Sequence, residues 1–367
     1  MIYLLKKATW AIEFIQVSIM KSKFLPCLLL LGLATYSEAQ SASSDPVGFV
    51  TLSLQQGNNY VGFSLMSQRA YQGAFTVETS NRARLYLTNA TLTNDQFNPP
   101  VISAGSQPTH IIEVIGDGAT QGLNTAIMDT VATGSEIVLQ EPLHPGVGSG
   151  GQLKIWKLWT IGDAFGPTNS AGLTSANTSN TSDIVLIPNG AGYDQYYYSA
   201  GGFSGAGWRK VGAGATDQKG VPLYYTDGFM ILARSAKTIN IVGSVKPGQT
   251  TVVLETGNNF LANLCPVNAG GDNPSTIGRT LGNSNLYNGT ANGLAGGNSV
   301  AAADLVLIGN GAGFDQFFYS TGGFVGTGWR QVGGGATDMA GKPLPDGAFI
   351  VFRRGAPTTV SLSQPSF

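Results

Sequence analysis

Charge is scarce in this sequence. Only 20 Lys and Arg and 21 Asp and Glu occur among 367 residues, for a net charge of −1. Such sparse and balanced charge excludes the basic patches with which proteins bind nucleic acids or anionic membrane surfaces. An aromatic content of 10% also excludes the polar composition of a disordered chain. We therefore expect a folded protein that does not bind nucleic acid.

Cysteine is almost absent. Cys27 lies in the predicted leader described below, so Cys265 would be alone in the mature chain. A single thiol cannot form an internal disulfide, and stability must then come from packing. We expect Cys265 to be a small buried side chain.

Catalytic and metal-binding motifs are also missing. His110 and His144 lack the spacing of metal ligands, and no Gly-x-Ser-x-Gly elbow is present. Two carboxylates could still meet in space to hydrolyse a glycosidic bond. The available glutamates are Glu78, Glu113, Glu136, Glu141 and Glu255. We predict no catalytic residues, no metal site and a protein that is not an enzyme.

Long hydrophobic runs are missing except near the N-terminus. Two lysines precede the apolar run Phe24–Ala34, and Ser37-Glu38-Ala39 supplies small residues at positions −3 and −1 of a cleavage site. This pattern is typical of a secretory signal peptide, here residues 1–39 with an over-long start. The run is too short to span a bilayer. We expect a mature chain, 40–367, without a transmembrane span, secreted or on the outer surface of a bacterial cell.

Sustained helical periodicity is absent as well. Apart from short stretches such as Thr160–Phe165, no segment repeats apolar residues at helical spacing between capping residues. Instead, 51 glycines and frequent Asn, Ser and Thr separate short runs rich in Val, Ile, Thr, Tyr and Phe. Such runs are typical of β-strands. The sequence predicts an all-β protein.

One stretch of the chain occurs twice. Residues 183–217 and 304–338 match at 25 of 35 positions without a gap. A match of this quality indicates a duplicated unit. A weaker similarity between Leu54–Tyr60 and Leu254–Phe260 extends the duplication towards the N-terminus of each copy.

The duplication predicts the architecture. We expect two related β-sandwich or barrel-like modules, the first at 40–245 and the second at 246–367. The first copy has extra residues at about 68–155 that contain their own strand signals. We therefore expect this insert to form a β subdomain, because a structureless loop of that length is unusual in a compact domain.

Each copy repeats a Trp, an Arg and an Asp. The candidate binding residues are Trp208, Arg209 and Asp217 in the first copy and Trp329, Arg330 and Asp338 in the second. In a ligand-binding interpretation, the indole stacks on a sugar ring while Arg and Asp bind its hydroxyls. In a structural interpretation, the Trp belongs to the core and the Arg and Asp fix a glycine-rich turn. We favour the structural interpretation.

Tyrosine and phenylalanine interchange between the copies. Tyr193, Tyr196 and Tyr197 correspond to Phe314, Phe317 and Phe318, whereas Tyr198 corresponds to Tyr319. The interchange keeps the ring and removes the hydroxyl, so these three rings should serve packing. Only the hydroxyls of Tyr198 and Tyr319 are expected to need a partner.

Calcium is the one ion that the turns suggest. Asn189, Asp194 and Asp217 carry oxygen atoms of the kind that calcium binds, but no DxDxDG loop is present. The run Asn189–Gly192 fits a tight hairpin turn better than a phosphate loop, because neither a helix nor a P-loop Lys follows it. We predict no cofactor, with calcium as a minor alternative.

Several blocks together resemble a known family. DPVGFVTLSL at 45–54, IWKLWTIGDAFG at 155–166, GWRKVG at 207–212 and DGFMILAR at 227–234 resemble a family of uncharacterised secreted proteins of Verrucomicrobia and related bacteria. The resemblance covers essentially the whole mature chain. It implies export from a bacterial cell, and it supplies no catalytic or binding residue.

These features favour one function over two alternatives. We expect a non-enzymatic structural or adhesive protein at the cell surface or outside the cell. The first alternative is a carbohydrate-binding protein that uses Trp and Tyr platforms, and the second is a glycoside hydrolase-like enzyme. The expected partners are extracellular glycans or other surface proteins.

Overall fold

The computed structural model describes residues 47–98, 107–115, 120–190, 192–246, 248–264, 278–290 and 292–362. The predicted leader with its cleavage site, and Cys265, lie outside these residues. The described residues all belong to one compact unit, Asp45–Phe367. The division of the mature chain into separate domains at 245/246 stays a prediction.

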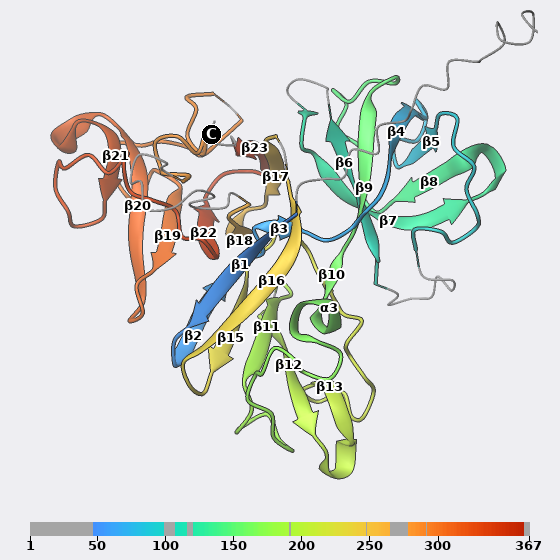
Figure 1. The fold of residues 1–367 in the computed structure, drawn as a ribbon. Helices are drawn as coiled ribbons and strands as arrows, with labels where there is room; N and C mark the ends of the chain where they lie inside the picture. Colours follow the sequence, from blue (N-terminus) through green and yellow to red (C-terminus); the bar gives the residue numbers. More distant parts are fainter. Residues whose placement is uncertain are drawn as a thin grey trace, which may run out of the picture. The chain divides into compact units, whose positions relative to one another are not determined.

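Two five-stranded antiparallel sheets have the same strand order (Figure 1). The first consists of β13 (Ala206–Lys210), β12 (Tyr193–Ala200), β11 (Ile184–Pro188), β15 (Phe229–Ala233) and β2 (Gly57–Val61). The second consists of β21 (Thr327–Gln331), β20 (Phe314–Thr321), β19 (Leu305–Gly309), β22 (Ala348–Arg353) and β18 (Gly257–Ala262). Each strand of one sheet therefore has a counterpart in the other.

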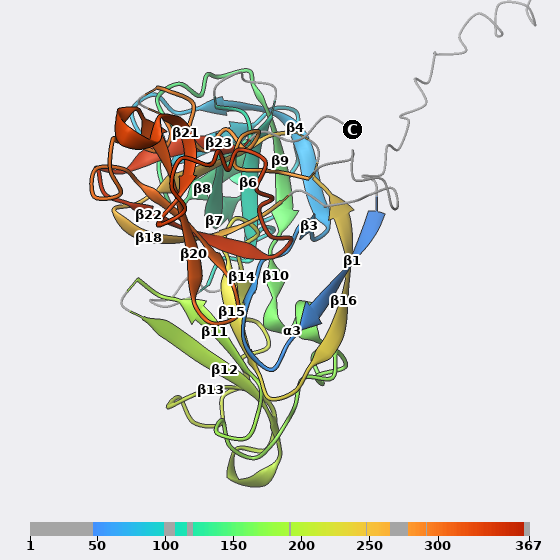
Figure 2. The same cartoon turned by 90° about the vertical axis from the view of Figure 1, so that its left-hand side faces the viewer.

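A ribbon accompanies each sheet. In the first module it pairs β1 (Val47–Leu54) with β16 (Lys237–Val245), which also pairs with β3 (Leu65–Met66). In the second module it pairs β17 (Thr250–Leu254) with β23 (Thr358–Leu362). The long β1–β16 ribbon is clear in the rotated view (Figure 2).

The same turn joins ribbon and sheet in both modules. Asn59 accepts a hydrogen bond from the Gln55 amide at 2.8 Å and donates one to the Gln55 carbonyl at 2.8 Å. Asn259 does the same with Glu255 at 2.8 and 2.7 Å. An Asn side chain that bonds nearby backbone groups stabilises a tight turn. The weak sequence similarity at these positions thus corresponds to one shared turn.

The insert in the first module is a closed barrel. Its strands, in order around the barrel, are β4 (Arg69–Val77), β5 (Arg84–Leu87), β8 (Glu136–Leu139), β7 (Asn124–Val131), β6 (His110–Ile115) and β9 (Gln152–Lys157). Closure pairs every strand on both sides and so removes exposed edges. The interior is apolar, and Phe75, Leu85, Ile112 and Ile155 are fully buried.

Helical structure is short. The helix α3 (Ile161–Phe165) follows β10 (Trp159–Thr160), which pairs with β14 (Pro222–Leu223). The Thr160 hydroxyl accepts a hydrogen bond from the Asp163 amide at 3.0 Å and caps the helix. One-turn 3-10 helices lie at Thr133–Ser135, Gly202–Ser204 and Gly323–Val325.

Aromatic rings join the two modules at equivalent positions. Tyr60 on β2 lies 5.0 Å from Phe314 on β20, and Tyr193 on β12 lies 5.7 Å from Phe260 on β18, measured between ring centroids. Tyr60 corresponds to Phe260, and Tyr193 to Phe314. Each module therefore contributes the same two rings, as two copies do in a symmetric dimer. The prediction of an all-β fold from two related modules, the first with a β insert, is confirmed.

Candidate functional site

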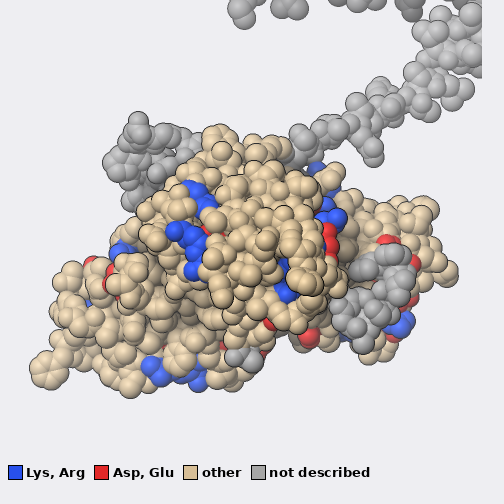
Figure 3. Space-filling view, turned by 90° about the horizontal axis from the view of Figure 1, so that it is seen from below, with Lys and Arg blue, Asp and Glu red and all other residues tan. Residues whose placement is uncertain are grey.

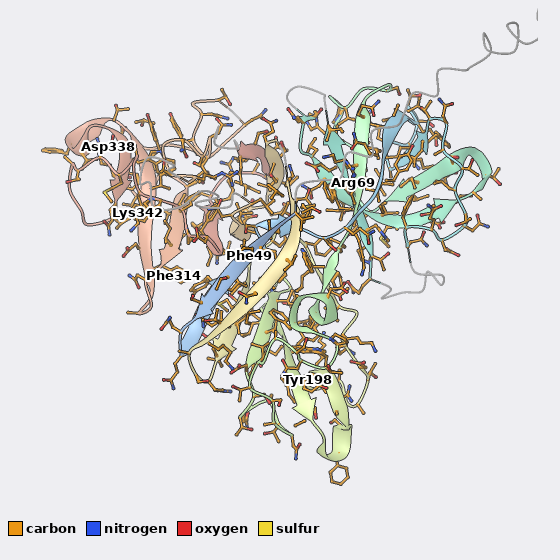
Figure 4. The ribbon with its side chains drawn as sticks, viewed as in Figure 1. Phe49, Arg69, Tyr198, Phe314, Asp338 and Lys342 are labelled. Atoms are coloured by element: carbon orange, nitrogen blue, oxygen red, sulfur yellow. The ribbon has the colours of Figure 1, made fainter. Side chains whose placement is uncertain are left out.

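The repeated Trp and Arg lie on the outermost hairpin of each sheet. Strand β12 pairs with β13 so that Tyr198 faces Trp208 and Tyr197 faces Arg209. Strand β20 pairs with β21 in the same register. Figure 4 marks Tyr198 on the first hairpin. The two hairpins can therefore be compared residue by residue.

Both indoles are buried. Trp208 has an exposed fraction of 0% and Trp329 of 3%. The Tyr198 ring packs edge-on against Trp208 at 5.6 Å, and Tyr319 against Trp329 at 5.8 Å. The Trp208 Nε1 donates to the carbonyl of Gly166 at 2.9 Å. A buried indole offers no face to a sugar ring, and this is the burial that the structural interpretation predicts.

The buried guanidinium of each copy binds backbone carbonyls of its own hairpin. Arg209 donates to Ser204 at 3.0 and 2.7 Å, to Ala206 at 3.0 Å and to Trp208 at 3.0 Å. Arginine suits this position because its rigid fork of five N–H groups can reach several acceptors at once.

The second copy repeats this arrangement. Arg330 donates to Val325 at 2.8 Å, Thr327 at 2.8 Å and Trp329 at 2.9 Å. Both arginines are 5% exposed. The guanidinium in each module therefore holds the loop between the two strands.

The repeated aspartates lie near the arginines but outside the core. Arg209 is 4.0 Å from Asp217, and Arg330 is 3.4 Å from Asp338. The Asp217 and Asp338 side chains are 40% and 59% exposed, and Figure 4 marks Asp338. Ion pairs as exposed as these contribute little to stability. The six candidate residues do come together as two triads, whereas their role as ligand-binding residues stays a prediction.

The loop at the end of each hairpin presents a phenylalanine that sequence reasoning missed. Phe203 has an exposed fraction of 112% and Phe324 of 109%, so both rings are entirely in solvent. Each belongs to a Gly-Gly-Phe-x-Gly run at equivalent positions of the duplication. The available signal was a large apolar residue kept in both copies between glycines, where no strand could bury it.

Glycine is required in this loop. Gly202 and Gly205 have φ of 73° and 67°, and Gly323 and Gly326 have φ of 78° and 70°. Residues with a Cβ are disfavoured at such angles. The matching angles show that both loops adopt the same conformation. We call these loops, residues 201–206 and 322–327, the phenylalanine tips.

Two of the three interchanged tyrosines, Tyr196 and Tyr197, are buried, whereas Tyr193 is 37% exposed. Tyr196 is 4% exposed and its counterpart Phe317 is 0% exposed, as expected for packing. However, the Tyr196 hydroxyl donates to Asp194 at 3.4 Å, a bond that Phe317 cannot make. Burial, followed by the charge of Asp194, raises the pKa of Tyr196 to about 12. Tyr196 thus uses its hydroxyl, although we assigned that need only to Tyr198 and Tyr319.

Protein groups already occupy the oxygen atoms suggested for calcium. Asp194 accepts a hydrogen bond from Lys210 at 2.7 Å and from the Asn189 side chain at 3.0 Å. The bond from Lys210 is the main reason why the pKa of Asp194 is lowered. Among the described residues, no group of three or more His, Cys, Asp or Glu side chains is placed to hold a metal ion.

Another repeated carboxylate, which sequence reasoning did not single out, is fully buried. Asp183 forms an ion pair with Lys237, and Asp304 forms one with Arg353 at 2.6 Å. Both aspartates also accept backbone N–H groups: Asp183 from Arg234 at 2.6 Å and Asp304 from Arg354 at 2.8 Å. These contacts tie the start of β11 and β19 to the end of β15 and β22, so they stabilise the sheet.

Four of the glutamates considered for catalysis lie in or next to the barrel, and Glu255 lies in the turn after β17. Glu113 is buried, pairs with Lys246 at 2.5 Å and accepts the Trp156 Nε1 at 2.7 Å. Glu136 pairs with Arg84 at 3.0 Å. Such partners are typical of buried or paired structural carboxylates.

Charged side chains are scattered on the surface. On the face seen in Figure 3, Lys, Arg, Asp and Glu are dispersed among uncharged residues. No helix among the described residues is long and apolar enough to cross a membrane.

Comparison with known proteins adds little. No protein-family model matches the chain, and no curated protein matches it significantly. Among solved structures, it is weakly similar to the VP16-VP17 complex, a complex of the two major capsid proteins of bacteriophage P23-77, at 11% identity and a TM-score of 0.16 over 55% of this chain and 89% of that chain. It is also weakly similar to VP17, a capsid protein of bacteriophage P23-77, at 11% identity and a TM-score of 0.14 over 54% of this chain and 86% of that chain.

Proposed function

We propose that this chain is a secreted or cell-surface structural or adhesive protein without enzymatic activity, and that its contact surfaces are the two phenylalanine tips. One observation carries the proposal: the duplicated hairpins present Phe203 and Phe324 fully to solvent from the same loop conformation. The leader pattern and the resemblance to a secreted bacterial family support export.

Exposure of the Phe203 and Phe324 rings to water is unfavourable for a chain that has no partner bound. Burying a phenylalanine side chain contributes about 1.5–3 kcal/mol, and neither tip gains this contribution. A single exposed apolar residue needs no explanation. Here the same residue is exposed twice, at equivalent positions, on loops that a buried arginine holds in place. Aromatic residues presented in this way are typical anchors of protein interfaces.

Two equivalent tips also favour adhesion over catalysis. A chain with two contact sites binds a surface more tightly than either site alone when both can engage. We call the buried pairs Trp208–Arg209 and Trp329–Arg330 the Trp–Arg base of each hairpin. These pairs make the hairpin rigid, and a rigid loop loses less entropy on binding. The carbohydrate-binding alternative would need a surface other than Trp208 and Trp329, because both indoles are buried.

Binding of the labelled chain to the surface of the cells that produce it would test this proposal. We expect Phe203→Ala/Phe324→Ala to lose binding, measured by flow cytometry, at unchanged thermal stability. Val211→Ala/Val332→Ala is the matched control, because these valines are also exposed and occupy equivalent positions outside the tips. Binding by the Phe variant equal to wild type, or no binding by wild type, would contradict the proposal. Competition by free sugars would instead favour the carbohydrate-binding alternative.

A further inference from the structure

A pocket at the junction of the two modules has the size to accept an aromatic ring. Its volume is about 190 Å³. Buried or half-buried apolar side chains line it, including Leu223, Phe229, Phe260 and Leu261. An apolar protein cavity of roughly 150 Å³ is enough to bind benzene. A phenyl ring therefore fits the space.

The rim of this cavity is accessible and partly polar. Val253 on β17 lines it and is 52% exposed. Asp227, Asn258 and Asn259 bring polar atoms to the same cavity. A pocket that combines apolar and polar lining residues can receive an anchor side chain.

The equivalent groove on the other side of the module junction is different. It has a volume of about 730 Å³, which is far larger than a phenyl ring. Gln55, Gln56, Asn58 and Asp346 are among its lining residues. The duplication has thus produced one small pocket and one large groove at equivalent places of the module junction.

We propose that a phenylalanine tip of one chain inserts its ring into the small pocket of a second copy, so that the protein assembles with itself. The ring of Phe203 or Phe324 is the anchor, and the pocket bounded by Leu223, Val253 and Leu261 is its receptor. This inference rests on the proposed structural role of the tips and specifies their partner.

The physical basis is complementarity within one sequence. The tip has no charged residue in 201–206 or 322–327, so it brings no unpaired charge into the pocket. The loop conformation is already fixed by Arg209 or Arg330, so little entropy is lost on insertion. The tip and the pocket are different surfaces of the chain, so the contact is heterologous and can repeat from copy to copy.

Sedimentation velocity of the purified chain over micromolar to submillimolar concentrations tests the inference. We expect the wild-type sedimentation coefficient to rise with concentration. Phe203→Ala/Phe324→Ala should weaken association by at least about tenfold, as expected when an anchor residue is truncated. Val253→Glu, which places a charge at the pocket, should do the same, whereas Val211→Ala/Val332→Ala should associate like wild type.

A mixing experiment makes the test specific. The Phe variant keeps its pocket and the Val253→Glu variant keeps its tips, so an equimolar mixture should form complexes that neither variant forms alone. A wild-type chain that remains monomeric, or tip variants that associate like wild type, would overturn the inference. If the chain is monomeric but its tips still mediate cell binding, only the choice of a second copy as the partner fails. If cell binding is also independent of the tips, the proposed function fails as well.

Discussion

The guanidinium of Arg209 donates two hydrogen bonds to the carbonyl oxygen of Ser204, at 3.0 and 2.7 Å. Arg330 makes the corresponding contact with Val325. Since Ser204 is replaced by Val325 while the bond persists, the contact depends on the backbone and not on the side chain at that position. The arginine thereby fixes the residue next to the exposed phenylalanine.

Replacing this arginine should destabilise the protein. In Arg209→Ala, the carbonyls of Ser204, Ala206 and Trp208 lose a charged donor, and we expect a loss of about 2–4 kcal/mol in the free energy of unfolding. Urea denaturation measures it. Asp217→Asn is the control, since its 4.0 Å exposed pair should contribute less than about 1 kcal/mol. Equal effects of the two variants would show that the ion pair matters more than the carbonyl contacts.

Truncating either buried indole should have a similar or larger effect. We expect Trp208→Ala and Trp329→Ala each to cost about 3–5 kcal/mol of unfolding free energy, because each leaves a cavity in a packed core. Thermal unfolding and urea titration can measure the loss. Phe203→Ala, which removes a solvent-exposed ring, should change stability by no more than about 0.5 kcal/mol. Tryptophan variants that melt like wild type would contradict the burial on which the structural interpretation depends.

Close backbone approach at the module junction gives a further prediction. A Cβ at Gly347 would overlap the carbonyl oxygen of Tyr60. We therefore expect Gly347→Ala to destabilise the chain by about 1–3 kcal/mol, as overpacking does. At Gly341 an added Cβ meets nothing within 4 Å, so Gly341→Ala is the control and should be nearly neutral. If both variants unfold alike, the two modules do not pack this closely in solution.

The sequence predicted the fold class because its signals are local. Short runs of β-branched and aromatic residues between glycines predict strands, and 25 identical positions in 35 predict a shared fold. The short helix at Thr160–Phe165 was also anticipated, and α3 lies there with Thr160 as its cap. These features depend on neighbouring residues alone.

The remaining features depend on contacts between distant parts of the chain. Closure of the barrel requires β4 to pair with both β5 and β9, and the intervening sequence does not specify this. The exposure of Phe203 and Phe324 depends on how the hairpin ends beyond the sheet, whereas an isolated Phe in sequence normally indicates a core position. The burial of Trp208 and Trp329 agrees with the structural interpretation favoured from the sequence, whereas the exposure of the Asp217 and Asp338 side chains could not be predicted.

Acid should destabilise the barrel through His110. Burial lowers the pKa of His110, and Lys157 adds to this, although a bond to the Phe97 carbonyl opposes it. The folded state then favours the neutral ring, so the contribution of His110 to stability is fully present above a pH of about 6.5 and is lost as the pH falls through the lowered pKa.

The pH dependence of urea unfolding checks this assignment. His110→Gln should show a smaller loss of stability than wild type when the pH falls below about 6.5. His144→Gln is the control for the loss of a histidine, because His144 lies at the exposed surface. Identical profiles for wild type and His110→Gln would rule out His110 as a source of acid sensitivity.

Each duplicated hairpin combines an exposed phenylalanine with a buried Trp–Arg base. Hydroxyl-radical footprinting with mass spectrometry, at a concentration where the chain is monomeric, tests it most directly. We expect Phe203 and Phe324 to be oxidised about as fast as in the unfolded chain, whereas Trp208 and Trp329 should be strongly protected. Protected phenylalanines together with rapidly oxidised tryptophans would contradict it, and would instead favour an indole platform for a ligand.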